Sequence, residues 1–181
     1  GSDPRNAQST EFLRTHPTSV NRSAAAKKQA RRMTVERKDE SLGFELSKAR
    51  IRHLDSSTPE RSYEYFSDKV NLNRSSNDLS DHQIGNLYGV ALSMVRLGLV
   101  DDAEPIIKKF LNEKHEFGHF HILYADLMIE KNTPKEAIQH LYKRLQLSPR
   151  NIPLTIKYAE LQLGYGDSKK AHDILLDLFN N

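Results

Sequence analysis

The sequence predicts an all-α fold made of helix-turn-helix units that stack on one another. Three sets of residues recur at intervals of 34 positions in the second half of the chain, and we call this interval the repeat period. They are an alanine of each first helix, an alanine of each second helix and one turn residue: Ala91, Ala125 and Ala159; Ala103, Ala137 and Ala171; Gly98, Asn132 and Gly166. A fixed period of this length is typical of helical arrays, and three landmarks in one register rarely coincide by chance.

Larger apolar residues accompany these alanines at helical spacing. The second helices read Ala103-x-x-x-Ile107, Ala137-x-x-x-Leu141 and Ala171-x-x-x-Leu175. A small residue allows two helices to cross closely, and the larger residue fills the space one turn away. The pattern resembles the tetratricopeptide repeat, so we expect a helical solenoid with repeats at about 84–117, 118–151 and 152–181. One hairpin cannot bury its apolar face alone, which is why such hairpins stack.

The rest of the chain divides by composition. We expect residues 1–10 to be a disordered or tag segment, and residues 11–38 to be an N-terminal extension with a linker helix. Residues 39–72 carry apolar residues at helical spacing on both sides of Thr58-Pro59, a helix start signal, and predict a degenerate leading hairpin before the repeats in 81–181. In the second repeat, Thr133-Pro134-Lys135-Glu136 predicts a capping box.

Charge is unevenly distributed along the chain. Residues 1–38 hold nine Lys/Arg against three acidic residues, a net charge of +6, whereas the remainder holds 18 against 21. The basic run Lys27-Lys28-Gln29-Ala30-Arg31-Arg32 has no interleaved aromatic residue for base stacking. We therefore interpret it as a solvated helix face and expect no nucleic acid partner. The sequence has no cysteine, which excludes disulfides and thiolate metal sites.

No apolar run approaches the roughly 20 residues that a membrane-spanning helix needs. We therefore expect no transmembrane segment.

One stretch matches a zinc-peptidase motif. His115-Glu116-Phe117-Gly118-His119 fits H-E-x-x-H, in which both histidines must lie one turn apart on a continuous helix to bind zinc. The repeat register instead places this stretch at the junction between two hairpins, and no third ligand is evident. His119 and His121 are two residues apart and would point away from each other on a helix. We interpret the match as an inter-repeat turn.

The first helix of each repeat is expected to line the concave face, which is the usual partner surface of such arrays. We predict that this face binds a protein or an extended peptide. Its residues are Tyr88, Leu92, Arg96, Ile122, Asp126, Glu130, Ile156, Glu160 and Leu163. They predict an apolar groove with an acidic bias and no run of Lys/Arg for a terminal carboxylate, which favours apolar or basic segments.

A family resemblance rests on two further stretches. Phe12-Leu13-x-Thr15-His16-Pro17-x-x-x-x-Arg22 is similar to a segment near the end of the catalytic domain in a broad family of zinc metallopeptidases. The stretch Leu42-x-Phe44-x-Leu46-x-Lys48-Ala49-Arg50 and the repeats resemble the C-terminal half of its periplasmic, repeat-bearing branch, the β-barrel assembly-enhancing protease family.

The resemblance implies that the catalytic motif and its zinc lie upstream in a parent protein, and that this chain holds neither. His16 would match a loop histidine that can reach the zinc of the full-length parent as an extra ligand. By the same resemblance the repeats would be periplasmic and would recruit substrates or the outer-membrane assembly machinery.

The leading hypothesis is thus a non-catalytic protein-interaction module of a zinc metallopeptidase. Two alternatives stay open. The first is an intrinsic zinc hydrolase that uses His115, Glu116 and His119. The second is a scaffold that self-associates through the apolar residues of its C-terminal helix, Leu175, Leu178 and Phe179.

Overall fold

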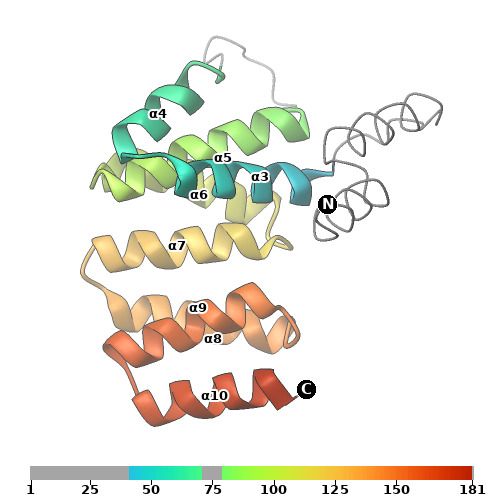
Figure 1. Cartoon of the computed structure of the whole chain (residues 1–181), viewed down its shortest axis with the longest axis vertical. Coiled ribbons are helices and arrows are strands. Elements are labelled where there is room, and N and C mark those ends of the chain that lie inside the picture. Colours follow the sequence, from blue (N-terminus) through green and yellow to red (C-terminus); the bar gives the residue numbers. More distant parts are fainter. Residues whose placement is uncertain (1–40, 71–78, 181) are drawn as a thin grey trace, which may run out of the picture. The chain divides into compact units, whose positions relative to one another are not determined.

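The computed structural model describes residues 41–70 and 79–180, which belong to one compact unit, Glu40–Asn181. These residues form eight helices and no strand, which confirms the predicted all-helical class (Figure 1). The predictions for residues 1–38, including His16 and Thr15-His16-Pro17, lie outside the described residues. The helices are α3 (Leu42–Asp55), α4 (Pro59–Ser67), α5 (Asp81–Arg96), α6 (Val100–Glu113), α7 (Gly118–Glu130), α8 (Pro134–Leu147), α9 (Ile152–Tyr165) and α10 (Ser168–Asn180).

The repeat period reappears in the helix boundaries. Helices α6, α8 and α10 begin at Val100, Pro134 and Ser168, and α7 and α9 begin at Gly118 and Ile152. Helix α5 begins at Asp81, slightly before the start expected at position 84. The six landmark alanines are all buried, with at most 2% of their surface exposed. The fold is therefore helical and repeat-like over residues 81–180.

The turns after α5 and α7 share one backbone structure. Gly98 and Asn132 have positive φ angles of 74° and 57°. The amides of Leu99 and Thr133, one residue later, each donate to the carbonyl five residues back, Met94 O and Met128 O, at 2.9 Å. This Schellman arrangement satisfies carbonyls that the end of a helix would otherwise leave free, and glycine and asparagine tolerate the left-handed conformation best.

The third turn departs from this pattern. Gly166 has φ −130° and ψ −125°, so its backbone is not left-handed. Gln162 occupies the position that Met94 and Met128 hold in the first two repeats, and its side chain accepts a hydrogen bond from the amide of Asp167 at 3.0 Å. A side-chain oxygen thus replaces the backbone carbonyl as acceptor, which is why this turn does not need a positive φ.

Helix starts agree in part with the sequence signals. Thr58 accepts a hydrogen bond from the amide of Arg61, as predicted. The predicted capping box at Thr133 is wrong, because the Thr133 hydroxyl donates back to the carbonyl of Met128 and caps no amide of α8. A complete capping box occurs instead at α5, where Ser80 and Gln83 bond reciprocally.

Consecutive helices from α5 to α10 pack against each other, whereas α3 and α4 both pack on α5 and contact each other little. Two glycines of α5 allow this close approach. A Cβ at Gly85 would lie 2.9 Å from Glu45 Cβ of α3, and one at Gly89 would overlap the Phe66 ring of α4. The leading hairpin is therefore splayed over the first repeat and does not follow the hairpin geometry of the repeats.

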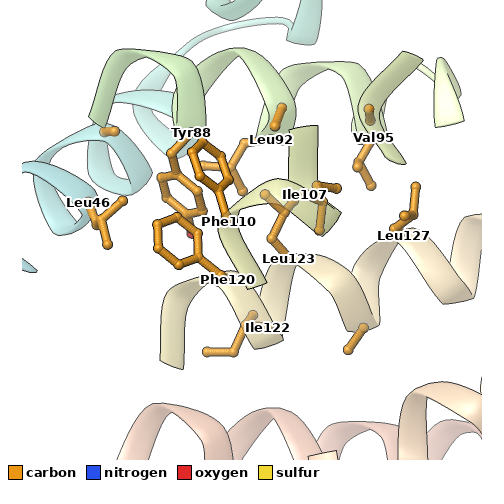
Figure 2. Close-up of a cluster of buried hydrophobic side chains, with 14 of the residues drawn as sticks. Leu46, Tyr88, Leu92, Val95, Ile107, Phe110, Phe120, Ile122, Leu123 and Leu127 are labelled. Carbon is orange, nitrogen blue, oxygen red and sulfur yellow. The ribbon is translucent and has the colours of Figure 1, made fainter. Parts of the chain in front are cut away.

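The core is continuous from α3 to α9. At its centre Phe110 and Phe120 stack with ring centroids 4.5 Å apart, and Tyr88 meets Phe120 edge-on at 5.6 Å. Leu46 of α3 reaches the same cluster (Figure 2). Aromatic residues from three helices and an aliphatic residue from a fourth therefore join the leading hairpin to the first two repeats.

Replacing Gly89 by alanine is expected to destabilise the fold by about 1–3 kcal/mol, because the new methyl group must displace the Phe66 ring and with it α4. Gly164 on α9 provides the matched control. A Cβ there meets nothing within 4 Å, so Gly164→Ala is expected to stabilise by about 0.5–1 kcal/mol. Urea unfolding followed by circular dichroism measures both changes. Equal effects of the two substitutions would contradict the close α4–α5 packing.

Candidate functional site

The described helices enclose a groove with α3 on one side, α9 on the other and α7 as its floor. It consists of two adjoining hollows that share four residues: Arg50, Leu54, Lys157 and Glu160. The larger has a volume of about 760 Å³, and the smaller, of about 370 Å³, extends toward α5. We call this feature the α3–α9 groove.

Helical spacing explains which side chains form the walls. Helix α3 contributes the single face Ser47, Arg50, Ile51 and Leu54, spaced i, i+3, i+4 and i+7. Helix α9 contributes one face with the same kind of spacing: Ile152, Pro153, Ile156, Lys157 and Glu160. Gly118, His119 and Ile122 of α7 complete the floor. Each helix thus turns its opposite face to the core and this face to the groove.

Apolar side chains dominate the larger hollow and are open to solvent. Ile51 and Leu54 on α3 are 68% and 63% exposed, and Ile152 and Ile156 on α9 are 54% and 41% exposed. Isolated apolar residues are ordinary on protein surfaces, but a contiguous set facing one hollow marks an interaction site. The larger hollow is therefore lined by a contiguous set of exposed apolar side chains.

Lys157 forms ion pairs with two carboxylates near the floor of the groove. Lys157 Nζ lies 2.7 Å from Asp126 Oδ1 and 3.4 Å from Glu160 Oε2. Burial opposes its charge, yet the two carboxylates outweigh burial and raise the pKa of Lys157. Lys157 is therefore charged, and its ammonium group is already paired with Asp126 and Glu160. Arg50 and Arg150 also line the larger hollow and have no ion pair among the described residues.

The expected acidic bias of the groove is wrong. Arg50, Arg96, Arg150 and Lys157 line the two hollows together with Asp126, Glu130 and Glu160. The sequence prediction missed Arg50 and Arg150 because it considered only the first helices of the repeats. Arg50 lies on α3, before the first repeat, and Arg150 lies in the loop before α9.

Seven of the nine residues predicted for the partner face line the groove. Those in the smaller hollow are Leu92, Arg96, Asp126, Glu130 and Glu160, and those in the larger are Ile122, Ile156 and Glu160. Tyr88 is fully buried under α3, and Leu163 is exposed on α9 outside both hollows. Tyr88 faces the core because α3 lies over the part of α5 that the repeat register predicts to face the groove.

Burial raises the pKa of the Tyr88 hydroxyl to about 12, although the nearby Arg50 guanidinium acts in the opposite direction. Tyr88 therefore serves the core as a neutral aromatic ring.

The H-E-x-x-H stretch does not form one helix. Helix α6 ends at Glu113, His115 and Glu116 form a turn, and α7 begins at Gly118. His119 then points toward α3, where its Nε2 lies 3.2 Å from Ser47 Oγ, while His121 points toward α8. Within residues 41–70 and 79–180, no three His, Asp or Glu side chains are grouped to hold a metal.

Buried His121 and half-buried His140 form a pair between α7 and α8. The Nε2 of His121 lies 2.7 Å from the carbonyl of His115, so that nitrogen carries the proton. We therefore assign His140 Nε2 as the donor to His121 Nδ1 at 2.9 Å. Burial lowers the pKa of both imidazoles, that of His140 to about 4. The neutral pair ties the inter-repeat turn to both helices of the second repeat.

A second polar cluster joins α3, α4 and α5 below the groove. His53 Nδ1 lies 2.9 Å from Ser62 Oγ, which lies 2.8 Å from Ser93 Oγ, and Ser93 donates to the Gly89 carbonyl at 2.8 Å. These three hydrogen bonds need three protons, and the two serine hydroxyls supply only two. We therefore assign the third proton to His53 Nδ1, which donates to Ser62 Oγ. Burial, with Arg96 and Arg50 nearby, lowers the pKa of His53 to about 4. The chain of hydrogen bonds fixes the leading hairpin on α5.

Comparison with protein-family models found no match to this chain, and comparison with curated proteins found none either. Among the described helices, none is long and apolar enough to cross a membrane, as the sequence predicted.

The buried histidines predict an acid-sensitive fold. His53 and His140 bind a proton near pH 6.5 when unfolded but only near pH 4 when folded, so the unfolded state binds more protons between these values. The free energy of unfolding is expected to be highest above pH 6.5 and to decrease as the pH drops toward 4. Urea unfolding across this range measures the slope.

The first repeat supplies the matched variant for this prediction. Leu87 and Ile106 occupy the positions that His121 and His140 hold in the second repeat, one repeat period later. The double variant His121→Leu/His140→Ile is expected to fold with a smaller slope between pH 6.5 and 4, because it removes two of the proton-uptake sites. An unchanged slope would show that this pair does not titrate as proposed.

Proposed function

We propose that residues 81–181 form a tetratricopeptide-repeat solenoid that binds a protein segment in the α3–α9 groove, and that the chain is a non-catalytic interaction module. The observation that carries this proposal is the set of exposed apolar residues from α3 and α9 facing one hollow above α7. Such a surface costs free energy while it faces water and gains free energy when a partner covers it.

The repeat assignment draws on two further observations. The helix starts recur at the repeat period, and the small landmark residues are buried where helices cross. Arrays of this kind present a concave surface formed by one helix of each repeat. The groove also includes α3, so the leading hairpin would take part in binding besides covering the end of the array.

The parent protein is a separate part of the proposal. The resemblance around Thr15-His16-Pro17 supports a periplasmic zinc metallopeptidase whose catalytic motif lies outside this chain. In that setting the module would present substrates to the peptidase or attach it to the outer-membrane assembly machinery. The zinc would then belong to the parent, with His16 as an extra ligand.

Selection from a displayed peptide library tests the binding function. Peptides selected on the wild-type chain are expected to bind at least tenfold more weakly to Leu54→Asp and to Ile156→Asp, because each substitution places a charge in the apolar hollow. Leu147→Asp is the control, since Leu147 is 75% exposed at the end of α8 and lines neither hollow. Fluorescence anisotropy measures the affinities. Selected peptides that bind all four proteins equally would contradict the groove as the binding site.

Self-association is a second candidate because α10 has an open apolar side. Of the residues predicted for this end, Phe179 is 85% exposed, whereas Leu175 and Leu178 are half-buried. Leu176, which was not predicted, is 51% exposed, and α10 packs mainly on α9 among the described helices. If two copies meet there, the wild-type chain sediments as a dimer at high concentration and Leu176→Asp/Phe179→Asp sediments as a monomer. A wild-type chain that stays monomeric at high concentration removes this candidate.

A further inference from the structure

We propose that the occupant of the α3–α9 groove is an amphipathic α-helix whose apolar stripe is flanked by acidic residues. This inference rests on the proposed binding function and names the chemistry of the partner. It differs from the preference for extended apolar or basic segments that the sequence indicated. Two observations carry it: the way the chain already covers the neighbouring part of the same face, and the charges that remain unpaired along the groove.

Helix α3 itself shows which kind of element fits this face. It lies on α5, buries Leu46 and Ala49 there, and approaches the α5 backbone closely at Gly85. Where α3 covers the first repeat, the face is closed and Tyr88 is fully buried. Beyond α3, over α7 and α9, the same face stays open as the larger hollow. A second helix alongside α3 would extend this layer over the next two repeats.

Backbone chemistry also favours a helix over an extended segment. The walls are faces of helices, whose own amides and carbonyls are paired within α3 and α9, so they offer few backbone partners to a strand. A helix satisfies its backbone internally and presents side chains at i, i+3, i+4 and i+7. The wall on α3 runs from Ser47 to Leu54, about 10 Å along the axis, and therefore accommodates about two turns of a partner.

The unpaired charges of the larger hollow are positive, whereas the smaller hollow holds Arg96 and Glu130, one charge of each sign and neither in an ion pair among the described residues. Arg50 on one wall and Arg150 beside the other have no ion pair among the described residues, while Lys157 is occupied by Asp126 and Glu160. These two arginines border the apolar residues Ile51, Leu54, Ile152 and Ile156. A helix with glutamates on both sides of its apolar stripe would pair with them, whereas a basic helix would be repelled.

The same charges argue against the chain's own N-terminal segment as occupant. Residues 1–38 have a net charge of +6 and would meet two unpaired arginines. A partner from another protein, rich in acidic residues around an apolar stripe, fits the groove better.

Three synthetic peptides of about 16 residues, a helix of about 24 Å, test this inference. The first carries leucines at i, i+3, i+4 and i+7 with flanking glutamates, the second has lysines in place of the glutamates, and the third is the first with a central proline. We expect the glutamate peptide to bind at least tenfold more tightly than the other two at low salt, because lysine reverses the ion pairs and proline breaks the helix. Fluorescence anisotropy gives the affinities, and circular dichroism of the complex reports the helix.

Charge reversal in the protein provides the matched comparison. Arg50→Glu/Arg150→Glu is expected to invert the preference, so that the lysine peptide binds more tightly than the glutamate peptide. Lys135→Glu/Lys143→Glu on α8 changes the net charge equally outside both hollows and should keep the wild-type order. Circular dichroism of the free variants confirms that each is folded before binding is compared.

The outcomes separate this inference from the proposed function. Equal binding of the glutamate and lysine peptides, tight binding of the proline peptide, or inversion in the α8 control would each overturn the acidic-helix inference. If library peptides bind the groove but the glutamate peptide does not, the binding function stands and the inference fails. If no peptide of either kind binds, both fail.

Discussion

The close approach of α3 to α5 is the contact on which the groove depends. It requires Gly85, because any side chain at that position would meet the Cβ and backbone of Glu45. Glu45 is itself 4% exposed, and its carboxylate is held by His82 of α5 at 3.0 Å and by Lys48 at 3.1 Å. A buried carboxylate is tolerated only when it is paired in this way. Without this contact α3 would leave the face of α5, and the groove would lose one of its two walls.

Two clusters of buried and half-buried polar side chains make the contacts between helices specific. The chain from His53 through Ser62 to Ser93 joins three helices, and the pair His121–His140 joins α7 and α8 to the carbonyl of His115. Apolar contacts alone would permit small shifts between helices at little cost, whereas hydrogen bonds inside a core are lost outright when the geometry changes. The histidines near the groove therefore stabilise the fold, and His115, whose carbonyl accepts from His121, lies in the turn before α7.

The groove combines an apolar floor and walls with isolated positive charges at its borders. This combination follows from the position of α3, which brings Arg50 opposite α9 although the two segments are far apart in sequence. Apolar area supplies most of the affinity in such a surface, and charges at its border select among partners that offer similar apolar stripes. In the smaller hollow Asp126 and Glu160 hold Lys157, and Arg96 and Glu130 also line it, so charges of both signs are mixed there.

Most of the repeat architecture could be predicted from the sequence because it rests on local and periodic features. The alanines, the helix starts and the left-handed turns at Gly98 and Asn132 recur at the repeat period, and each reflects a steric requirement of a single hairpin. The third turn could not be predicted in the same way, since a side-chain acceptor from Gln162 replaces a backbone one. The H-E-x-x-H stretch was assigned correctly to the junction between two helices because the repeat period outweighed the motif, although its last two residues, Gly118 and His119, already belong to α7.

By itself, the sequence determined the all-helical class and the repeat period, and it identified seven of the side chains that line the groove. Only the tertiary structure decided that α3 closes the face over Tyr88, that Arg50 and Arg150 border the groove, and that the groove is not acidic. The physical reason is that periodic patterns report the sterics within a repeat. The leading hairpin lies outside the period, and its place is set by long-range contacts at Gly85 and Gly89.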